Sequence, residues 1–201
     1  MDTAGIIHKV IAKADGVART ADFNAAGVPN YIVAGWCKRG LIDRVRNGYY
    51  TLPEQDDKRE EVIIAHLFPD GIICMDSALF HYGYSDKTPL EWHMAFPRSV
   101  TRSRFEAGYP PVHCYMVQPN LLECGKTTGD WFGVTLSVYD RERTICDCFK
   151  HRSTMDSEMF AKALNAYAAD DKKNLAKLSA YAKKLRVHRP VAEIMGVLLN
   201  G

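Results

Sequence analysis

The stretch WCKRGLIDRVRNGYYTL, residues 36–52, decides the fold of the amino-terminal part of this chain. Its Asn47-Gly48 pair stands between two runs of β-prone residues, and both positions of a two-residue hairpin turn favour positive φ. We therefore predict a β-hairpin with strands at 41–46 and 49–52. Gly40, directly before the first strand, is a typical residue for ending a preceding helix.

Working back along the chain, helices are expected at 3–14, 20–26 and 29–39, because apolar residues recur there at helical spacing. Thr20 is a favourable N-cap for the second helix, and Gly27 is suited to end it. Three helices followed by a hairpin is the order of a winged helix-turn-helix, in which the third helix enters the major groove of DNA. We assign residues 1–53 to such a domain.

The third helix is expected to have two faces. Val33, Trp36 and Cys37 recur at i, i+3 and i+4, so they should pack against the other helices and leave the opposite face to the major groove. Amide and phenol groups can bond base edges, whereas lysine and arginine neutralise phosphates. The candidate DNA-binding residues are Arg19, Thr20, Asn30, Tyr31, Lys38, Arg39, Arg44, Arg46 and Asn47.

The distribution of charge agrees with this assignment. The formal net charge is only +2, but residues 1–55 hold seven Lys/Arg against five Asp/Glu and therefore carry the whole surplus, 7 − 5 = +2. Within them, Lys38, Arg39, Arg44 and Arg46 cluster within nine residues and are opposed only by Asp43, which makes a local basic patch in a chain that is not basic as a whole. A small structural domain, or a module that binds only other proteins, is the alternative interpretation of the same three helices and hairpin.

The location and redox state can also be predicted. No apolar run approaches the roughly 20 residues of a membrane span, and the first residues lack the pattern of a secretory signal, so we expect a cytoplasmic protein without a membrane partner. The six cysteines lie inside apolar segments without a Cys-x-x-Cys pair. They are expected to be reduced and to behave as small hydrophobic residues.

We predict that the protein binds no metal ion and no cofactor.

The rest of the chain, residues 58–201, follows a polar, proline-led linker at 53–58. Short apolar or alternating runs predict strands at 72–75, 92–96, 112–117 and 134–138. Helices are expected at 58–68, 76–81, 141–151, 157–169, 172–186 and 190–199. The expected fold class is therefore α+β, with an amino-terminal winged helix-turn-helix followed by a larger mixed domain that ends in a helical segment.

Motifs for enzymatic chemistry are weak. There is no phosphate-binding glycine loop, no Gly-x-Ser-x-Gly and no His-Glu-x-x-His. Asp70, followed later by Glu91-Trp92-His93, faintly resembles the paired carboxylates of a metal-dependent nuclease, but His93 stands where a lysine is usual. We predict no enzymatic activity, and a nuclease guided by the winged helix remains an alternative.

Two further groups of polar residues could form a second surface. Arg98, Arg102 and Arg104 lie within one loop, and a group of guanidiniums suits phosphates or RNA. The second group, Arg143, Thr144 and Asp147, has a plain structural interpretation: Asp140 caps a helix and Arg143 pairs with a carboxylate. A role in neutralising a toxin is the alternative for that group.

The sequence resembles the AbiEi-type antitoxins. The segment from Val17 to Tyr50 is similar to their amino-terminal domain, which couples an arginine-threonine start, a glycine turn and the pattern RRG-L-x-R-V-x-x-G-x-Y. The segment Val138–Asp147 is similar to their SPERT-x-x-D helix start, and the carboxy-terminal helices ending at Tyr181-Ala182-Lys183-Lys184-Leu185 extend the resemblance. Where that family usually has serine or arginine on the third helix, this chain has Ala34 and Gly35.

The resemblance implies a function. AbiEi-type proteins are antitoxins of type IV toxin–antitoxin modules in phage defence, encoded beside a nucleotidyltransferase-like toxin. They repress their own promoter through the winged helix and counteract the toxin without a stable complex. The expected partners are thus double-stranded DNA at the protein's own operator, bound by a possible dimer, and a nucleotidyltransferase-like toxin. Direct binding to the toxin is the alternative mode.

Overall fold

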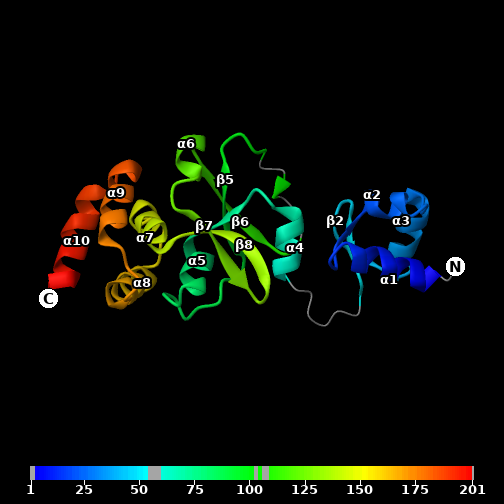
Figure 1. The fold of residues 1–201 in the computed structure, drawn as a ribbon, viewed down its shortest axis with the longest axis horizontal. Coiled ribbons are helices and arrows are strands. Elements are labelled where there is room, and N and C mark those ends of the chain that lie inside the picture. The colour runs from blue at the N-terminus through cyan, green and yellow to red at the C-terminus, as the bar shows by residue number, and fades with distance from the viewer. Residues whose placement is uncertain (1–2, 54–59, 102–103, 106–108, 201) are drawn as a thin grey trace. The chain divides into compact units, whose positions relative to one another are not determined.

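The computed structural model describes residues 3–53, 60–101, 104–105 and 109–200. The chain divides into two compact units (Figure 1). Unit 1 comprises residues 1–69 with 106–111, and unit 2 comprises residues 70–105 with 112–201. None of the helices in the described ranges is long and apolar enough to cross a membrane.

Unit 1 combines helices with a small antiparallel sheet of strand order β1-β3-β2. Strand β3 pairs with both neighbours, and the β2–β3 register shifts between Arg44 and Arg46. The elements are α1 (Thr3–Lys13), β1 (Ala18–Arg19), α2 (Thr20–Ala25), α3 (Asn30–Lys38), β2 (Asp43–Arg46), β3 (Tyr49–Thr51) and α4 (Glu60–Leu67).

Three aromatic rings hold the core of unit 1 together. Phe23 of α2 is fully buried and packs edge-to-face on Trp36 of α3 and on Tyr50 of β3, each at 6.0 Å between centroids. Edge-to-face packing adds to the free energy of burial because the positive ring edge meets the negative ring face. Ile7 and Ile11 of α1 complete the same cluster. The helices and the hairpin therefore share one core.

Two local predictions in unit 1 require correction. Thr20 is not the N-cap of α2: the cap is Arg19, whose backbone N–H donates to the Asp22 carboxylate at 2.7 Å. The Thr20 hydroxyl instead donates to the Gly48 carbonyl of the hairpin turn, at 3.4 Å. Strand β1 was not expected, because two residues carry no periodic signal; it forms because β3 offers a free edge to Ala18 and Arg19.

Unit 2 is built on a five-stranded mixed sheet of order β6-β5-β4-β8-β7. β5 pairs parallel with β6 and β4 parallel with β8, whereas β4–β5 and β7–β8 are antiparallel. The elements are β4 (Ile72–Ile73), α5 (Met75–His81), β5 (Trp92–Pro97), β6 (Val112–Val117), α6 (Pro119–Leu122), β7 (Lys126–Trp131), β8 (Val134–Tyr139), α7 (Arg141–Lys150), α8 (Ser157–Ala169), α9 (Leu175–Leu185) and α10 (His188–Asn200).

The four last helices stand together beside the sheet, yellow to red in Figure 1. Their apolar faces form one cluster with α5, in which Leu79, Ile145, Cys146, Leu164 and Leu178 are almost fully buried. The six cysteines are unbonded thiols, of which four are buried and Cys37 and Cys114 are half-buried.

The mixed α+β fold class is confirmed, but two elements of unit 2 were missed. β7 lies at the sheet edge and its sequence, KTTGDW, lacks apolar alternation, so only its pairing with β8 makes it a strand. Gly129 in this strand is required by packing, because a Cβ there would lie 2.6 Å from His81 Nε2. The short helix α6 begins with Pro119 and has no buried residue, so it too gives little sequence signal.

We predict that Phe23→Ala destabilises unit 1 by about 3–5 kcal/mol, because it removes the ring shared by α2, α3 and β3 and leaves a cavity. Urea unfolding of the full chain measures the effect. Tyr31→Ala is the matched control: this ring is 73% exposed, so its removal should change stability by no more than about 0.5 kcal/mol. Equal effects of the two variants would contradict the proposed core.

Candidate functional site

Helix α3 has the buried face and the exposed polar face that the sequence predicts. Val33 and Trp36 are buried, and Cys37 is half-buried against the same cluster. Asn30, Tyr31 and Lys38 are exposed, as is Ala34 between them. At about 100° per residue these four positions fall within one arc of the helix surface. An amide, a phenol and an ammonium group therefore project from one side of unit 1.

The hairpin places further polar groups at its turn. Arg44 and Asn47 are exposed, and the Arg44 guanidinium donates to the Asn47 side-chain oxygen. Arg46 is half-buried, with its guanidinium 5.7 Å from the centre of the Phe68 ring. The turn is closed by Gly48 at φ +81°, a conformation that glycine adopts without strain. Both arginines of the hairpin therefore lie in strand β2, directly before a turn of defined conformation.

The other predicted DNA contacts of unit 1 divide into two kinds. Arg19 and Arg39 are exposed, Arg19 beside Asp22 and Arg39 at the C-cap of α3. Arg39 lies about 100° beyond Lys38, outside the arc of Asn30 and Tyr31. Thr20 is half-buried and its hydroxyl donates to the hairpin turn. Thr20 therefore has a structural role in joining α2 to the hairpin.

The arginine loop of unit 2 does not carry three available guanidiniums. Arg104 donates to both oxygens of Asp70, at 2.7 and 2.5 Å, and lies 5.6 Å from the centre of the Phe96 ring. The same guanidinium lowers the pKa of Asp70 by hydrogen bonding, against the effect of partial burial. Arg98 is exposed, and Arg102 lies outside the described residues. The guanidinium of Arg104 is therefore already bound by Asp70, although 29% of the Arg104 side chain stays accessible.

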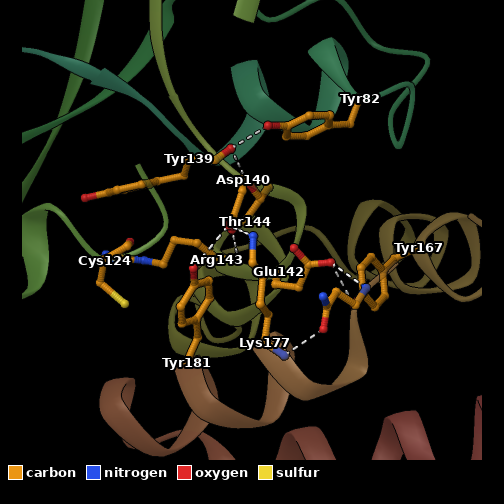
Figure 2. Close-up of polar contacts among 11 residues, drawn as sticks. Tyr82, Cys124, Tyr139, Asp140, Glu142, Arg143, Thr144, Tyr167, Lys177 and Tyr181 are labelled. Carbon is orange, nitrogen blue, oxygen red and sulfur yellow. Dashed lines mark hydrogen bonds and ion pairs between the residues drawn. The ribbon is translucent and has the colours of Figure 1, made fainter. Parts of the chain in front are cut away.

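The guanidinium of Arg143 is fully buried at the start of α7 (Figure 2). Its Nη1 donates to the carbonyls of Leu121 and Cys124, both at 2.8 Å, and its Nε donates to the Asp147 carboxylate at 3.0 and 3.1 Å. Its charge lies 4.1 Å from the centre of the Tyr139 ring. One side chain thus connects α7, the end of β8 and the loop after α6.

The neighbouring side chains of the same helix start bind the other helices. Asp140 caps α7 by accepting from the Arg143 N–H at 2.9 Å, and it also accepts from the Tyr181 hydroxyl of α9 at 3.2 Å. Glu142 accepts from the Tyr167 hydroxyl of α8 at 3.3 Å and from the Asn174 N–H at 2.7 Å (Figure 2). The helix start is therefore a junction of the carboxy-terminal helices.

This burial corrects the prediction of a second surface. Arg143 and Thr144 are 0% exposed and Asp147 is 5% exposed, so none of them can contact a macromolecule in this fold. The Thr144 hydroxyl donates to the Tyr139 carbonyl at 3.3 Å, which also accepts from the Tyr82 hydroxyl at 2.9 Å. The contacts support the structural interpretation of the Arg143-Thr144-Asp147 group, in which Asp140 caps the helix and Arg143 pairs with a carboxylate.

The pair of carboxylates considered for a nuclease is not formed. Asp70 precedes β4 and Glu91 precedes β5, and these strands are antiparallel, so the two residues lie at opposite ends of the strand pair. Asp70 is bound by Arg104, and Glu91 accepts from His113 Nδ1 at 3.0 Å. Among the described residues, no group of three or more His, Cys, Asp or Glu has an arrangement that could hold a metal ion.

Sequence reasoning missed a cavity of about 630 Å³ in unit 2. It lies over β5 and β6, between the start of α5, the 87–91 loop and the residues after α7. The strand register places His93 directly opposite His113, and the histidines are twenty positions apart in the chain, so spacing gave no sign of the pair. Its polar lining residues are Asp76, Lys87, Thr88, Glu91, His93, His113, Tyr115, His151, Thr154 and Asp156.

Comparison with known proteins defines the class of fold. No protein-family model matches this chain, and no curated protein matches it. Among solved structures it is similar to the RV2827C protein from Mycobacterium tuberculosis, with a TM-score of 0.61 and 15% sequence identity over 91% of this chain and 72% of that chain. At this identity the likeness shows the fold, and the chain is a mixed α+β protein of that architecture.

We predict that Arg143→Met lowers the free energy of unfolding by about 3–5 kcal/mol at pH 8, because it leaves Asp147 buried without its cation. Burial raises the pKa of Asp147, and Arg143 acts against that rise. A carboxyl whose pKa is higher folded than unfolded binds protons more tightly in the folded state, so stability falls as the pH rises through the folded pKa. The destabilisation should therefore be smaller at pH 5, measured by urea unfolding.

Two controls accompany this variant. The double variant Arg143→Met/Asp147→Leu removes both charges and should recover much of the stability. Arg189→Met removes an exposed arginine whose side chain is 90% accessible, and should change stability by no more than about 0.5 kcal/mol. A destabilisation that is independent of pH, and unchanged in the double variant, would show that the ion pair is not the cause.

Proposed function

We propose that unit 1 is a winged helix-turn-helix that binds double-stranded DNA and represses transcription from the protein's own promoter. The observation that carries the proposal is the exposed arc of α3, in which Asn30, Tyr31 and Lys38 project opposite the buried Val33 and Trp36. A recognition helix requires this division into a packed face and a polar face.

Each group of this arc has a distinct task in the proposed complex. Asn30 and Tyr31 lie in the first turn of α3, where a recognition helix contacts base edges, and the amide can pair with adenine. Lys38 neutralises a phosphate at the far end of the helix. Arg44, in strand β2 of the hairpin, contacts the DNA backbone as part of the wing. A two-fold operator would take two copies of the protein.

We further propose that the protein is the antitoxin of a type IV module, whose toxin is nucleotidyltransferase-like. This proposal is supported by the resemblance of residues 17–50 and 138–186 to AbiEi-type antitoxins. Arg143, Thr144 and Asp147 are buried, so a surface of unit 2 that neutralises the toxin must consist of other residues. The alternative function, a metal-dependent nuclease, would need Asp70 and Glu91 close together. These two carboxylates lie at opposite ends of the β4–β5 strand pair.

We predict that the triple variant Lys38→Ala/Arg44→Ala/Arg46→Ala binds the DNA upstream of its own gene at least about tenfold more weakly than the unaltered protein. The variant neutralises fewer phosphates, so the slope of log K against log salt should also become shallower by about 0.9 for each phosphate that is no longer neutralised. A gel-shift titration at several salt concentrations measures both quantities.

A charge-matched control comes from unit 2. Lys172, Lys183 and Lys184 are exposed at and before α9, and their triple replacement by alanine changes net charge equally. This control should keep the affinity of the unaltered protein. If both triple variants weaken binding to the same extent, the binding depends on net charge and not on α3 and the hairpin. Absence of preference for the upstream DNA over random duplex would exclude the repressor function.

The antitoxin function has a separate test. Co-expression with a nucleotidyltransferase-like protein encoded beside this chain should restore growth of cells that the toxin arrests. The Lys38/Arg44/Arg46 variant should restore growth equally well, because its three changes lie in unit 1 and leave unit 2 unaltered. Co-purification of the two proteins distinguishes neutralisation by direct binding from neutralisation without a stable complex. Failure to restore growth would exclude the antitoxin proposal and leave the repressor proposal intact.

A further inference from the structure

The exposed face of α3 carries large polar side chains at its ends and very small groups in its middle. Residues four apart lie about 40° from each other around a helix, so Asn30, Ala34 and Lys38 form one row along this face. Tyr31 and Gly35 form a second row beside it. All of these positions except Gly35 are exposed, and Tyr31 is 73% accessible. The middle of the face therefore consists of a methyl group and a glycine.

Neither packing nor backbone conformation among the described residues requires glycine at position 35. A Cβ at Gly35 would meet no heavy atom within 4 Å outside its own turn of the helix. Its φ is not positive, so a residue with a side chain could adopt the same conformation. Glycine inside a helix is less stable than alanine, because its backbone loses more freedom on folding. A partner that approaches the helix closely would give this glycine a use.

The polar side chains of the same face are available to such a partner. In the described part of the chain, no hydrogen bond or ion pair engages the side chains of Asn30, Tyr31 or Lys38. Thr20 and Arg44 differ, because their side chains bond to residues of the hairpin turn. The Asn30 amide therefore keeps both its donors and its acceptor for the edge of a base.

An A·T base pair has the chemistry that matches this face. In the major groove adenine presents N7 as an acceptor and its N6 amino group as a donor, and an asparagine amide bonds both. Thymine presents a 5-methyl group, which an alanine methyl group contacts favourably. Guanine is read by arginine or lysine, and within the described α3 arc that chemistry is confined to Lys38, the last residue of the helix. The first turns of α3 therefore favour A·T over G·C pairs.

We propose that α3 reads an A·T-rich half-site, in which the Asn30 amide pairs with an adenine and the Ala34 methyl group packs against a thymine methyl group. Gly35 permits this approach, because a side chain there would hold the helix away from the base edges. Asn30 and Ala34 are about 6 Å apart along the helix axis, which corresponds to about two base-pair steps. This preference rests on the DNA binding proposed above for unit 1, whose exposed face it uses.

Base analogues test the two contacts without altering Watson–Crick pairing. The probe is the DNA upstream of the protein's own gene, made with uracil in place of thymine or with 7-deazaadenine in place of adenine. Uracil lacks only the 5-methyl group, and 7-deazaadenine lacks the N7 acceptor. In gel-shift titrations the full chain should bind the uracil probe about fourfold more weakly than the natural probe. It should bind the 7-deazaadenine probe at least about fivefold more weakly.

Two variants assign each loss of affinity to a residue. Ala34→Gly has no methyl group to contact thymine, so it should bind the thymine and uracil probes equally. Asn30→Ala has no amide, so it should bind the adenine and 7-deazaadenine probes equally. Each variant is the control for the other, because Ala34→Gly should stay sensitive to 7-deazaadenine and Asn30→Ala to uracil. The ratio between two probes is measured with one protein, so a change in protein stability does not alter it.

A third variant separates close approach from stability. Gly35→Ala should raise the midpoint of urea unfolding, because alanine favours the helix, and yet weaken binding to the natural probe at least about fivefold by crowding the groove. Gly5→Ala is the matched control. It makes the same change in α1, where a Cβ would also meet no heavy atom within 4 Å among the described residues, and it should leave the affinity unchanged.

The outcomes separate this proposal from the DNA-binding function itself. Weaker binding of each analogue probe, which the matching variant abolishes, supports the A·T preference. Equal binding of the natural, uracil and 7-deazaadenine probes overturns the preference and leaves the DNA-binding function in place. So does a sensitivity to both analogues that Ala34→Gly and Asn30→Ala retain. A Gly35→Ala variant that binds as tightly as the unaltered protein overturns the close approach. Absence of binding to every probe overturns both proposals.

Discussion

The fold of unit 2 depends on the burial of one charged side chain. Arg143 is 0% exposed; two of its four side-chain hydrogen bonds reach Asp147 within α7, and the other two connect α7 to the carbonyls of Leu121 in α6 and Cys124 after it. A buried guanidinium is tolerated only when its donors are satisfied and its charge is compensated, here by Asp147 and the Tyr139 ring. The constraint extends to Gly125, where a Cβ would lie 2.4 Å from the Arg143 Cβ. Position 125 therefore requires glycine, because any other residue would collide with the start of α7.

The two units use arginine in opposite ways. In unit 1, Lys38, Arg39 and Arg44 are exposed, Arg46 is half-buried near the Phe68 ring, and three aromatic rings close the core. In unit 2, Arg104, Arg141 and Arg143 are each bound by a carboxylate and lie over an aromatic ring. Arginines therefore give mainly exposed cations around α3 and the hairpin of unit 1 and carboxylate-bound connections at these three positions of unit 2, and composition cannot distinguish the two uses.

The histidine cavity shows why scattered residues can form a site without leaving a pattern. His93 and His113 share no motif, because the parallel pairing of β5 with β6 fixes their register and α7 brings His151 close to Tyr115. The register between two strands that are far apart in the chain is set by the tertiary fold. The same reason explains β7 and β1, which are strands only because a neighbouring strand offers an edge.

The sequence by itself determined the helices of unit 1, the hairpin at Asn47-Gly48 and the two faces of α3, because short-range periodicity and turn chemistry specify them. It also indicated the α+β class and the Asp140 cap of α7. Only the tertiary structure decided that Asp70 binds Arg104, that Arg143 and its partner Asp147 are buried, and that His93 and His113 are stacked. Burial and ion pairing depend on which segments, distant in the sequence, pack over a side chain. The spacing of residues along the chain does not specify this packing.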